Sequence, residues 1–175
     1  MKRIIPLLML LALLPVGVFA LDFYVGANAY YASLIQPADI QAIDTASLNM
    51  ADFSFGGEAR IVGSLLWASA IGTYTPADAN MPHRLDVMLD GGVGLALGIV
   101  RAGIGIGPNY GIEMGDNAGN YFKTGANMRL TGDVLFGPVS VGLSWISKIE
   151  FTRASFVAAF ENPYGQLGLA VLYKL

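Results

Sequence analysis

The stretch TGANMRLTGDVLFGPVSVGLSWI, residues 124–146, alternates between two kinds of residue. One set is small or apolar and consists of Thr124, Ala126, Met128, Leu130, Gly132 and Val134. The other set contains Gly125, Asn127, Arg129, Thr131 and Asp133. A period of two predicts β-strands, and the turn residues Phe136-Gly137-Pro138 predict a hairpin that joins two of them. The pattern leaves open what surrounds each face of this hairpin.

The same alternation recurs along the chain and predicts eight strands. Their approximate ranges are 21–32, 52–61, 65–74, 84–96, 99–112, 122–135, 139–149 and 164–175. About three residues join the second strand to the third, the fourth to the fifth and the sixth to the seventh. The other four connections are longer and fall at 33–51, 75–83, 113–121 and 150–163. This strict alternation places all the long connections at one end of the sheet, an asymmetry typical of transmembrane β-barrels.

The beginning of the chain predicts export. Lys2 and Arg3 precede an apolar run of about 15 residues, which ends at Val18-Phe19-Ala20. This is the pattern of a cleavable signal peptide over residues 1–20, with residues 21–175 as the mature domain. An uncleaved membrane anchor is the alternative, but a helical span needs ~20 apolar residues. The chain contains no cysteine, so neither a disulfide framework nor a lipidated cysteine is expected.

Composition narrows the class of protein. Hydrophobic residues make up 54% of the chain and charged residues 13%, yet beyond residue 20 no apolar segment is long enough for a transmembrane helix. Without Lys2 and Arg3, 8 basic residues face 13 acidic ones, which gives a formal charge of −5. That charge argues against nucleic acid as a partner.

A soluble β-sandwich would place the apolar face in its core and the polar face in water. Two features favour a membrane barrel instead. The polar face is rich in glycine, which suits the crowded interior of a narrow barrel better than an exposed strand. The predicted strands are also longer than the ~5–6 residues usual in soluble proteins and match the ~9–11 residues that span a bilayer. We therefore expect an all-β, eight-stranded antiparallel barrel with its apolar face toward lipid.

Five negative and five positive side chains fall on the predicted inward face, and we expect them to form a charge network in the lumen. They are Asp52, Glu58, Asp86, Asp90 and Asp133, with Arg60, Arg101, Lys123, Arg129 and Lys148. Register puts Asp86, Lys123 and Lys148 toward the loop end. Asp90, Glu58 and Arg129 fall near mid-height, and Arg60, Arg101 and Asp133 toward the turn end. Such a network can simply satisfy the interior, or it can line a narrow conduit for small solutes.

Aromatic residues gather near both ends of the strands, as in the girdles of membrane barrels. Phe23, Trp67, Phe136 and Tyr173 are expected near the turn end, and Tyr31, Phe53, Tyr74 and Phe122 near the loop end. Tyr24 and Tyr30 fall on the inward face and are expected to be packing residues.

With these features the chain resembles the small eight-stranded outer-membrane β-barrels, the superfamily of the OmpA transmembrane domain, OmpX and OmpW. The resemblance includes the C-terminal strand QLGLAVLYKL, which is similar to the signal read by the barrel assembly machinery, although it ends in Leu175 rather than Phe or Trp. It implies location in the outer membrane, contact with outer-membrane lipid and a monomeric state. The implied role is structural or surface-exposed, with passage of small or hydrophobic molecules as a further function of such barrels.

The residues give little support for catalysis or for a cofactor. His83 is the only histidine and stands near the outer end of a strand, where a lipid-modifying barrel enzyme would place its catalytic group. Ser33, Ser47 and Asp78 could complete a triad, but no spacing singles them out. The run GIGIGPNYG lacks dinucleotide-binding spacing, and one histidine without cysteine argues against a metal site. A non-enzymatic barrel is therefore expected; the rivals are a lipid-modifying enzyme and a soluble secreted β-protein that binds a ligand in its lumen.

Overall fold

The computed structural model describes residues 21–36, 50–77, 82–115, 122–150 and 164–175. The predicted signal peptide therefore lies outside the described residues and stays a prediction. Among the residues described, no helix is long and apolar enough to cross a membrane, a result that does not bear on crossing by strands.

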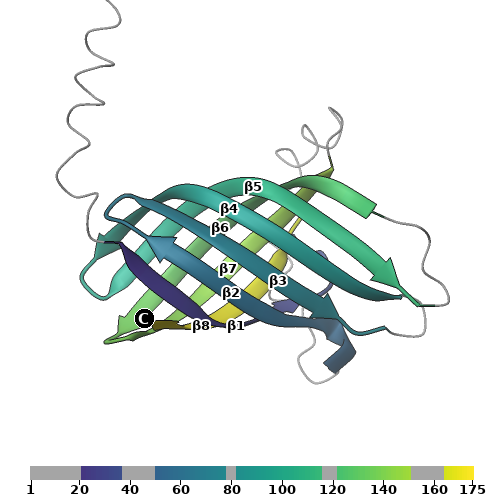
Figure 1. Ribbon diagram of the computed structural model, residues 1–175, viewed down its shortest axis with the longest axis horizontal. Coiled ribbons are helices and arrows are strands. Elements are labelled where there is room, and N and C mark those ends of the chain that lie inside the picture. Colours follow the sequence, from purple (N-terminus) through teal and green to yellow (C-terminus); the bar gives the residue numbers. More distant parts are fainter. Residues whose placement is uncertain (1–20, 37–49, 78–81, 116–121, 151–163) are drawn as a thin grey trace, which may run out of the picture.

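Eight antiparallel strands form one closed barrel, in which every strand pairs with its neighbours in the sequence and β1 pairs with β8 (Figure 1). The strands are β1 (Asp22–Tyr31), β2 (Phe53–Val62), β3 (Leu66–Thr75), β4 (His83–Leu97), β5 (Val100–Met114), β6 (Phe122–Phe136), β7 (Val139–Glu150) and β8 (Gln166–Lys174). A single-turn 3-10 helix, η2 (Met50–Asp52), precedes β2. The predicted fold class is confirmed, and the strand limits agree with the predicted ones to within about two residues.

Short connections join β2 to β3, β4 to β5 and β6 to β7, whereas the longer connections leave from the opposite end. We call these the turn end and the loop end of the barrel. Two of the short turns contain a glycine at a positive φ, Gly98 (62°) and Gly137 (61°), a conformation that other residues adopt only at a cost. The C-terminus lies at the turn end, beside the start of β1 (Figure 1).

The register staggers as it runs round the barrel. From Asp22, successive partners lead through Val62, Trp67, Gly92, Gly105, Arg129 and Ile146 to Gln166. The amide of Gln166 donates to the backbone oxygen of Ala32, so the path returns to the first strand ten positions beyond Asp22. A stagger of this kind requires strands tilted by roughly 35–45° from the barrel axis, and eight strands leave an interior that side chains can fill.

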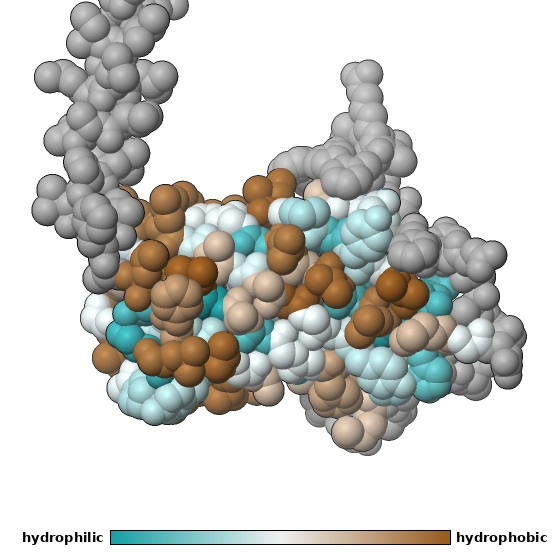
Figure 2. Space-filling view, viewed as in Figure 1, coloured by the Kyte–Doolittle hydropathy of each residue, from teal (hydrophilic) through white to brown (hydrophobic). Residues whose placement is uncertain are grey.

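Burial in this barrel is the reverse of burial in a soluble protein. Leu89, Leu97, Ile106 and Leu143 on the outer face are half or more exposed, and Leu97 reaches 78%. The fully buried side chains include Arg129, Asn127 and Asp133, which point inward. Figure 2 shows the apolar residues spread over the outer surface of the strands. The described residues therefore leave the apolar face uncovered, and the polar face forms the core.

Candidate functional site

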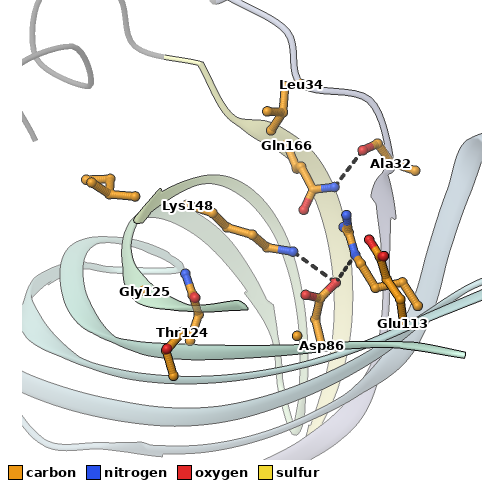
Figure 3. A pocket seen from close by; sticks show the side chains of 12 residues that line it. Ala32, Leu34, Asp86, Glu113, Thr124, Gly125, Lys148 and Gln166 are labelled. Atoms are coloured by element: carbon orange, nitrogen blue, oxygen red, sulfur yellow. Dashed lines mark hydrogen bonds and ion pairs between the residues drawn. The ribbon is translucent and has the colours of Figure 1, made fainter. Parts of the chain in front are cut away.

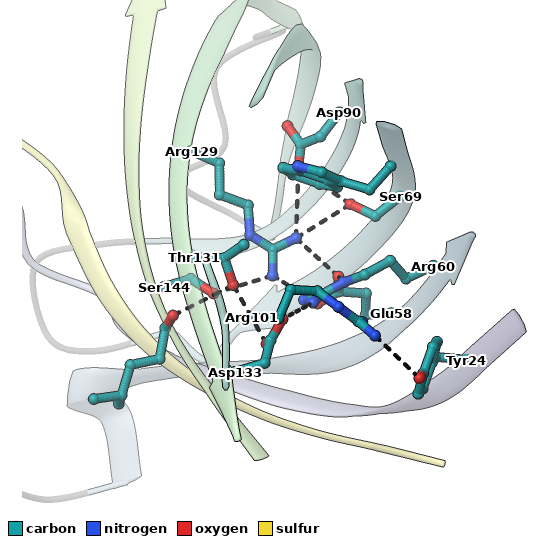
Figure 4. A network of polar contacts seen from close by, with 12 residues as sticks. Tyr24, Glu58, Arg60, Ser69, Asp90, Arg101, Arg129, Thr131, Asp133 and Ser144 are labelled. Atoms are coloured by element: carbon teal, nitrogen blue, oxygen red, sulfur yellow. Dashed lines mark hydrogen bonds and ion pairs between the residues drawn. The ribbon is translucent and has the colours of Figure 1, made fainter. Parts of the chain in front are cut away.

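Arg129 lies at the centre of the lumen with 0% of its side chain exposed. Its two terminal nitrogens donate to the two carboxylate oxygens of Glu58 at 2.8 and 2.9 Å, a bidentate ion pair between β6 and β2. They also donate to the hydroxyls of Ser69 (3.1 Å) and Ser144 (3.0 Å), and Asp90 lies 3.5 Å away. Figure 4 shows the guanidinium surrounded by these groups. One cation thus connects β2, β3, β4, β6 and β7 across the lumen.

A second arginine extends the network toward the turn end. The Nε atom of Arg60 contacts Glu58 at 2.7 Å, and its Nη1 contacts Asp133 at 2.7 Å. All three side chains are almost fully buried, and Glu58 lies between the two guanidinium groups (Figure 4). Charges removed from water in this way are tolerable only because each has an opposite partner and hydrogen bonds. This central group, Glu58, Arg60, Asp90, Arg129 and Asp133, is called the lumen plug below.

Trp67 was expected in the outer aromatic girdle, and this prediction is wrong. Its side chain is only 6% exposed and lies inside the barrel, where the guanidinium carbons of Arg60 and Arg129 are 5.8 and 5.6 Å from the ring centroid. Arginine over an aromatic face is a favourable cation–π arrangement. The indole nitrogen donates to the backbone oxygen of Val93 at 3.2 Å. In the middle of β3 the outward residues Ala68, Ala70 and Gly72 are small, whereas Trp67 and Ile71 point into the lumen.

Glycines on β5 make the space that Trp67 occupies. A Cβ atom at Gly105 would lie 2.6 Å from Cζ2 of the indole, and one at Gly103 would lie 2.7 Å from its nitrogen. Both distances are too short for a side chain to coexist with the ring. The glycine-rich inward face predicted from the sequence therefore includes a slot for one large aromatic residue.

The remaining predicted charges lie at the two ends. Toward the turn end, Arg101 contacts the hydroxyl of Tyr24 at 3.3 Å and lies over its ring. Toward the loop end, Asp86 accepts from Arg84 at 2.7 Å and from Lys148 at 3.1 Å. Asp52 is half-buried in η2, before β2 begins. The Lys123 side chain lies outside the part that the structure describes. Arg84, Ser69 and Ser144 were not among the predicted residues, although Ser69 and Ser144 occupy inward positions of β3 and β7.

A cavity of about 190 Å³ opens at the loop end, and we call it the vestibule. It is lined by Ala32, Leu34, Arg84, Asp86, Asn109, Gly111, Glu113, Thr124, Gly125, Lys148, Ile149 and Gln166. Figure 3 shows Lys148 and Asp86 pointing toward each other across it. Polar groups line one side, whereas Leu34, Ala32 and Ile149 supply apolar surface.

The other girdle residues lie as follows. Phe23, Phe136 and Tyr173 are 48–60% exposed on the outer face near the turn end. At the loop end, Tyr31, Phe53 and Phe55 form a row of ring contacts with centroids 6.0 and 6.2 Å apart. Tyr74 is exposed and stacks on His83. The Phe122 side chain lies outside the described set.

Within the described part of the chain, His83 is held by Tyr74 and by the backbone of Ala77. Its Nδ1 accepts from the Tyr74 hydroxyl at 2.5 Å and from the backbone N–H of Ala77 at 3.0 Å. An Nδ1 atom that accepts both bonds is the unprotonated nitrogen of the ring. Of the residues proposed as triad partners, Ser47 and Asp78 fall outside the described residues. Within the described ranges, no three His, Cys, Asp or Glu side chains are grouped to hold a metal.

The comparisons with known proteins concern the fold. No protein-family model matches the chain, and no curated protein is significantly similar to it in sequence. The crystal structure of the N-terminal β-barrel domain of Pseudomonas aeruginosa OprF superposes with a TM-score of 0.60 at 12% sequence identity, covering 91% of this chain and 100% of that one. The chain has the fold of the OprF barrel. The expected likeness to OmpA-type eight-stranded barrels is thereby confirmed at the level of fold.

Replacing Arg129 by Met is expected to destabilise the barrel by about 3–5 kcal/mol, because Glu58 keeps only Arg60 as a partner and Asp90 loses its ion pair while buried. Unfolding by guanidinium chloride in detergent micelles measures the loss of stability. Acidification should restore part of that stability, because it neutralises the two carboxyl groups. Lys174→Met is the control, since Lys174 pairs with Asp22 at 2.6 Å on the exposed turn end and should change stability little. Equal stability of the two variants would contradict the role given to Arg129.

Replacing Gly105 by Val is expected to cost about 1–3 kcal/mol by forcing Trp67 out of its slot. Gly132→Val is the matched control, because a Cβ at Gly132 points outward and meets nothing within 4 Å. The same unfolding experiment, together with the near-ultraviolet circular dichroism of Trp67, distinguishes the Gly105→Val protein from the Gly132→Val protein. A Gly105→Val protein as stable as Gly132→Val, with an unchanged Trp67 signal, would show that the slot is not needed.

Proposed function

We propose that the chain is an integral outer-membrane barrel with a structural or surface-exposed role and a lumen closed by its plug. The single observation that carries the proposal is the inverted burial, with leucine, isoleucine and phenylalanine exposed over the strands and arginine, aspartate and glutamate buried between them. A soluble protein rarely exposes so much contiguous apolar surface. A lipid bilayer covers such a surface and also requires the closed hydrogen bonding that this barrel has.

The plug supports a closed lumen rather than an open channel. Glu58 and Arg129 both have 0% side-chain exposure, and Trp67 fills the space beside them. A passage for small solutes, the second function considered, would require the ion pairs of Arg129 to break and its neighbours to move. In the proposed role the barrel anchors its outer connections, and the loop end is the part that meets the surroundings.

The proposal includes no catalysis. His83 uses Nδ1 to accept from Tyr74 and Ala77, so a hydrolytic role would first require these contacts to be lost. The exported state, the monomeric state and recognition of the C-terminal strand by the barrel assembly machinery belong to the same proposal. They are supported by the sequence of the first 20 residues and by the place of β8 as the strand that closes the barrel onto β1.

The two tryptophans provide a direct test, since they lie on opposite faces of the wall. Trp67 is in the lumen, whereas Trp145 faces outward between its register partners Leu130 and Leu167. In vesicles of lipid with brominated acyl chains, the Trp67→Phe protein should lose most of its fluorescence, because the remaining Trp145 contacts lipid. The Trp145→Phe protein should keep its fluorescence, because the barrel wall shields Trp67.

Heat-modifiable gel migration confirms folding of both variants before the fluorescence is compared. Equal quenching of the two proteins would contradict a folded barrel with lipid on its outer face and a dry plug inside. Absence of quenching in both would contradict membrane insertion.

A further inference from the structure

The two cations of the vestibule share one carboxylate, whereas each arginine of the lumen plug contacts two. Within the plug, every arginine contacts at least one carboxylate and Glu58 accepts from two of them. In the vestibule, Arg84 Nε and Lys148 Nζ both contact one atom, the Oδ2 of Asp86, at 2.7 and 3.1 Å. The two cations are thus within about 6 Å of each other and repel. One carboxylate compensates only one of them.

Glu113, the second acid of the lining, is not in ion-pair contact with Arg84 or Lys148. Glu113 is the register partner of Arg84 across β4 and β5, yet it forms no ion pair with a described residue. It is half-exposed near the end of β5, where water solvates it. Among the described residues, the two terminal nitrogens of Arg84 contact no acceptor, because its bond to Asp86 uses Nε alone. The Arg84 side chain is 33% exposed and that of Lys148 19%, so both can be reached from the cavity.

We propose that the vestibule binds an oxyanion, a phosphate or carboxylate group, between Arg84 and Lys148. An oxyanion accepts from the terminal nitrogens of Arg84, which have no acceptor among the described residues, and from the remaining N–H groups of Lys148; charge-assisted bonds of this kind are strong. The amide nitrogens of Asn109 and Gln166 in the wall already donate to the backbone oxygens of Ala126 and Ala32. The proposal needs no opening of the lumen plug and is independent of conduction.

The size of the vestibule limits what else the ligand carries. Its volume of about 190 Å³ is below the roughly 300–1,000 Å³ of pockets that enclose a drug-sized molecule. The cavity therefore takes the charged group and a few attached carbons, and Leu34, Ala32 and Ile149 offer these carbons an apolar wall. Such a group can come from a small soluble anion or from the phosphate of a membrane lipid.

The test titrates inorganic phosphate into the barrel in neutral detergent and follows the Lys148 ammonium signal by NMR together with the heat of binding. We expect saturable binding that Lys148→Met and Arg84→Gln each weaken at least about tenfold, the loss of one charged hydrogen bond. Asp86→Asn should have the opposite sign and tighten binding, because it removes the competing carboxylate. Lys174→Met, which deletes a lysine paired with Asp22 at the turn end, should bind phosphate as the natural chain does.

Vesicles distinguish the two sources of the anion. If phosphate binds equally in vesicles of phosphatidylcholine with or without phosphatidylglycerol, the ligand is a soluble anion. If phosphatidylglycerol abolishes phosphate binding, a lipid headgroup occupies the site, and either result supports the proposal. Absence of saturable binding in neutral detergent would overturn it, as would binding that survives in both Arg84→Gln and Lys148→Met. If Lys148→Met fails to fold, the Arg84→Gln protein provides the test, because Arg84 lies at the rim.

Discussion

The ion pair between Arg129 and Glu58 is the interaction on which the rest of this barrel depends. A closed barrel with an apolar outer face has nowhere else to place its charges, so they must satisfy one another across the lumen. Arg129 contacts Glu58 with both terminal nitrogens, and Glu58 in turn accepts from Arg60. Removing one member leaves its partners buried with fewer opposite charges. The network thus links β2, β3, β4, β6 and β7 into one unit.

The stagger of the strands determines which residues can join this network. Trp67, Gly92, Gly105 and Arg129 are successive members of one path of register partners, which brings β3, β5 and β6 together around the indole. The glycine leaves room for the indole, and the indole lies against two guanidinium groups. The polar interior can therefore hold a large aromatic residue, because the glycine provides the volume and the two guanidinium groups provide favourable contacts.

The sequence alone predicted most of the fold because strand alternation and connection length are local properties. The order of the ion pairs along the barrel also follows from register. Asp86 and Lys148 lie toward the loop end, Glu58 and Arg129 near the middle, and Arg60 and Asp133 toward the turn end.

The orientation of Trp67 could not be predicted in this way. The residues Leu66, Ala68 and Ala70 alternate with Trp67, Ser69 and Ile71, so both faces of β3 carry apolar residues and hydropathy does not choose between them. Its orientation is decided by distant partners, the space at Gly105 and the two arginines. The bond between His83 and Tyr74 likewise depends on the pairing of β3 with β4. Arg84 was missed because it stands at the predicted end of its strand, at the rim of the barrel.

Single-channel conductance of the refolded mature chain in a planar bilayer tests the central claim, that the plug centred on Arg129 closes the lumen. The natural chain, inserted and folded as shown by heat-modifiable migration, should be silent. Replacing both Arg129 and Glu58 by Ala removes the paired charges together and should produce discrete conductance steps. Steps of a defined size from the natural chain would contradict the account and make the lumen a pathway.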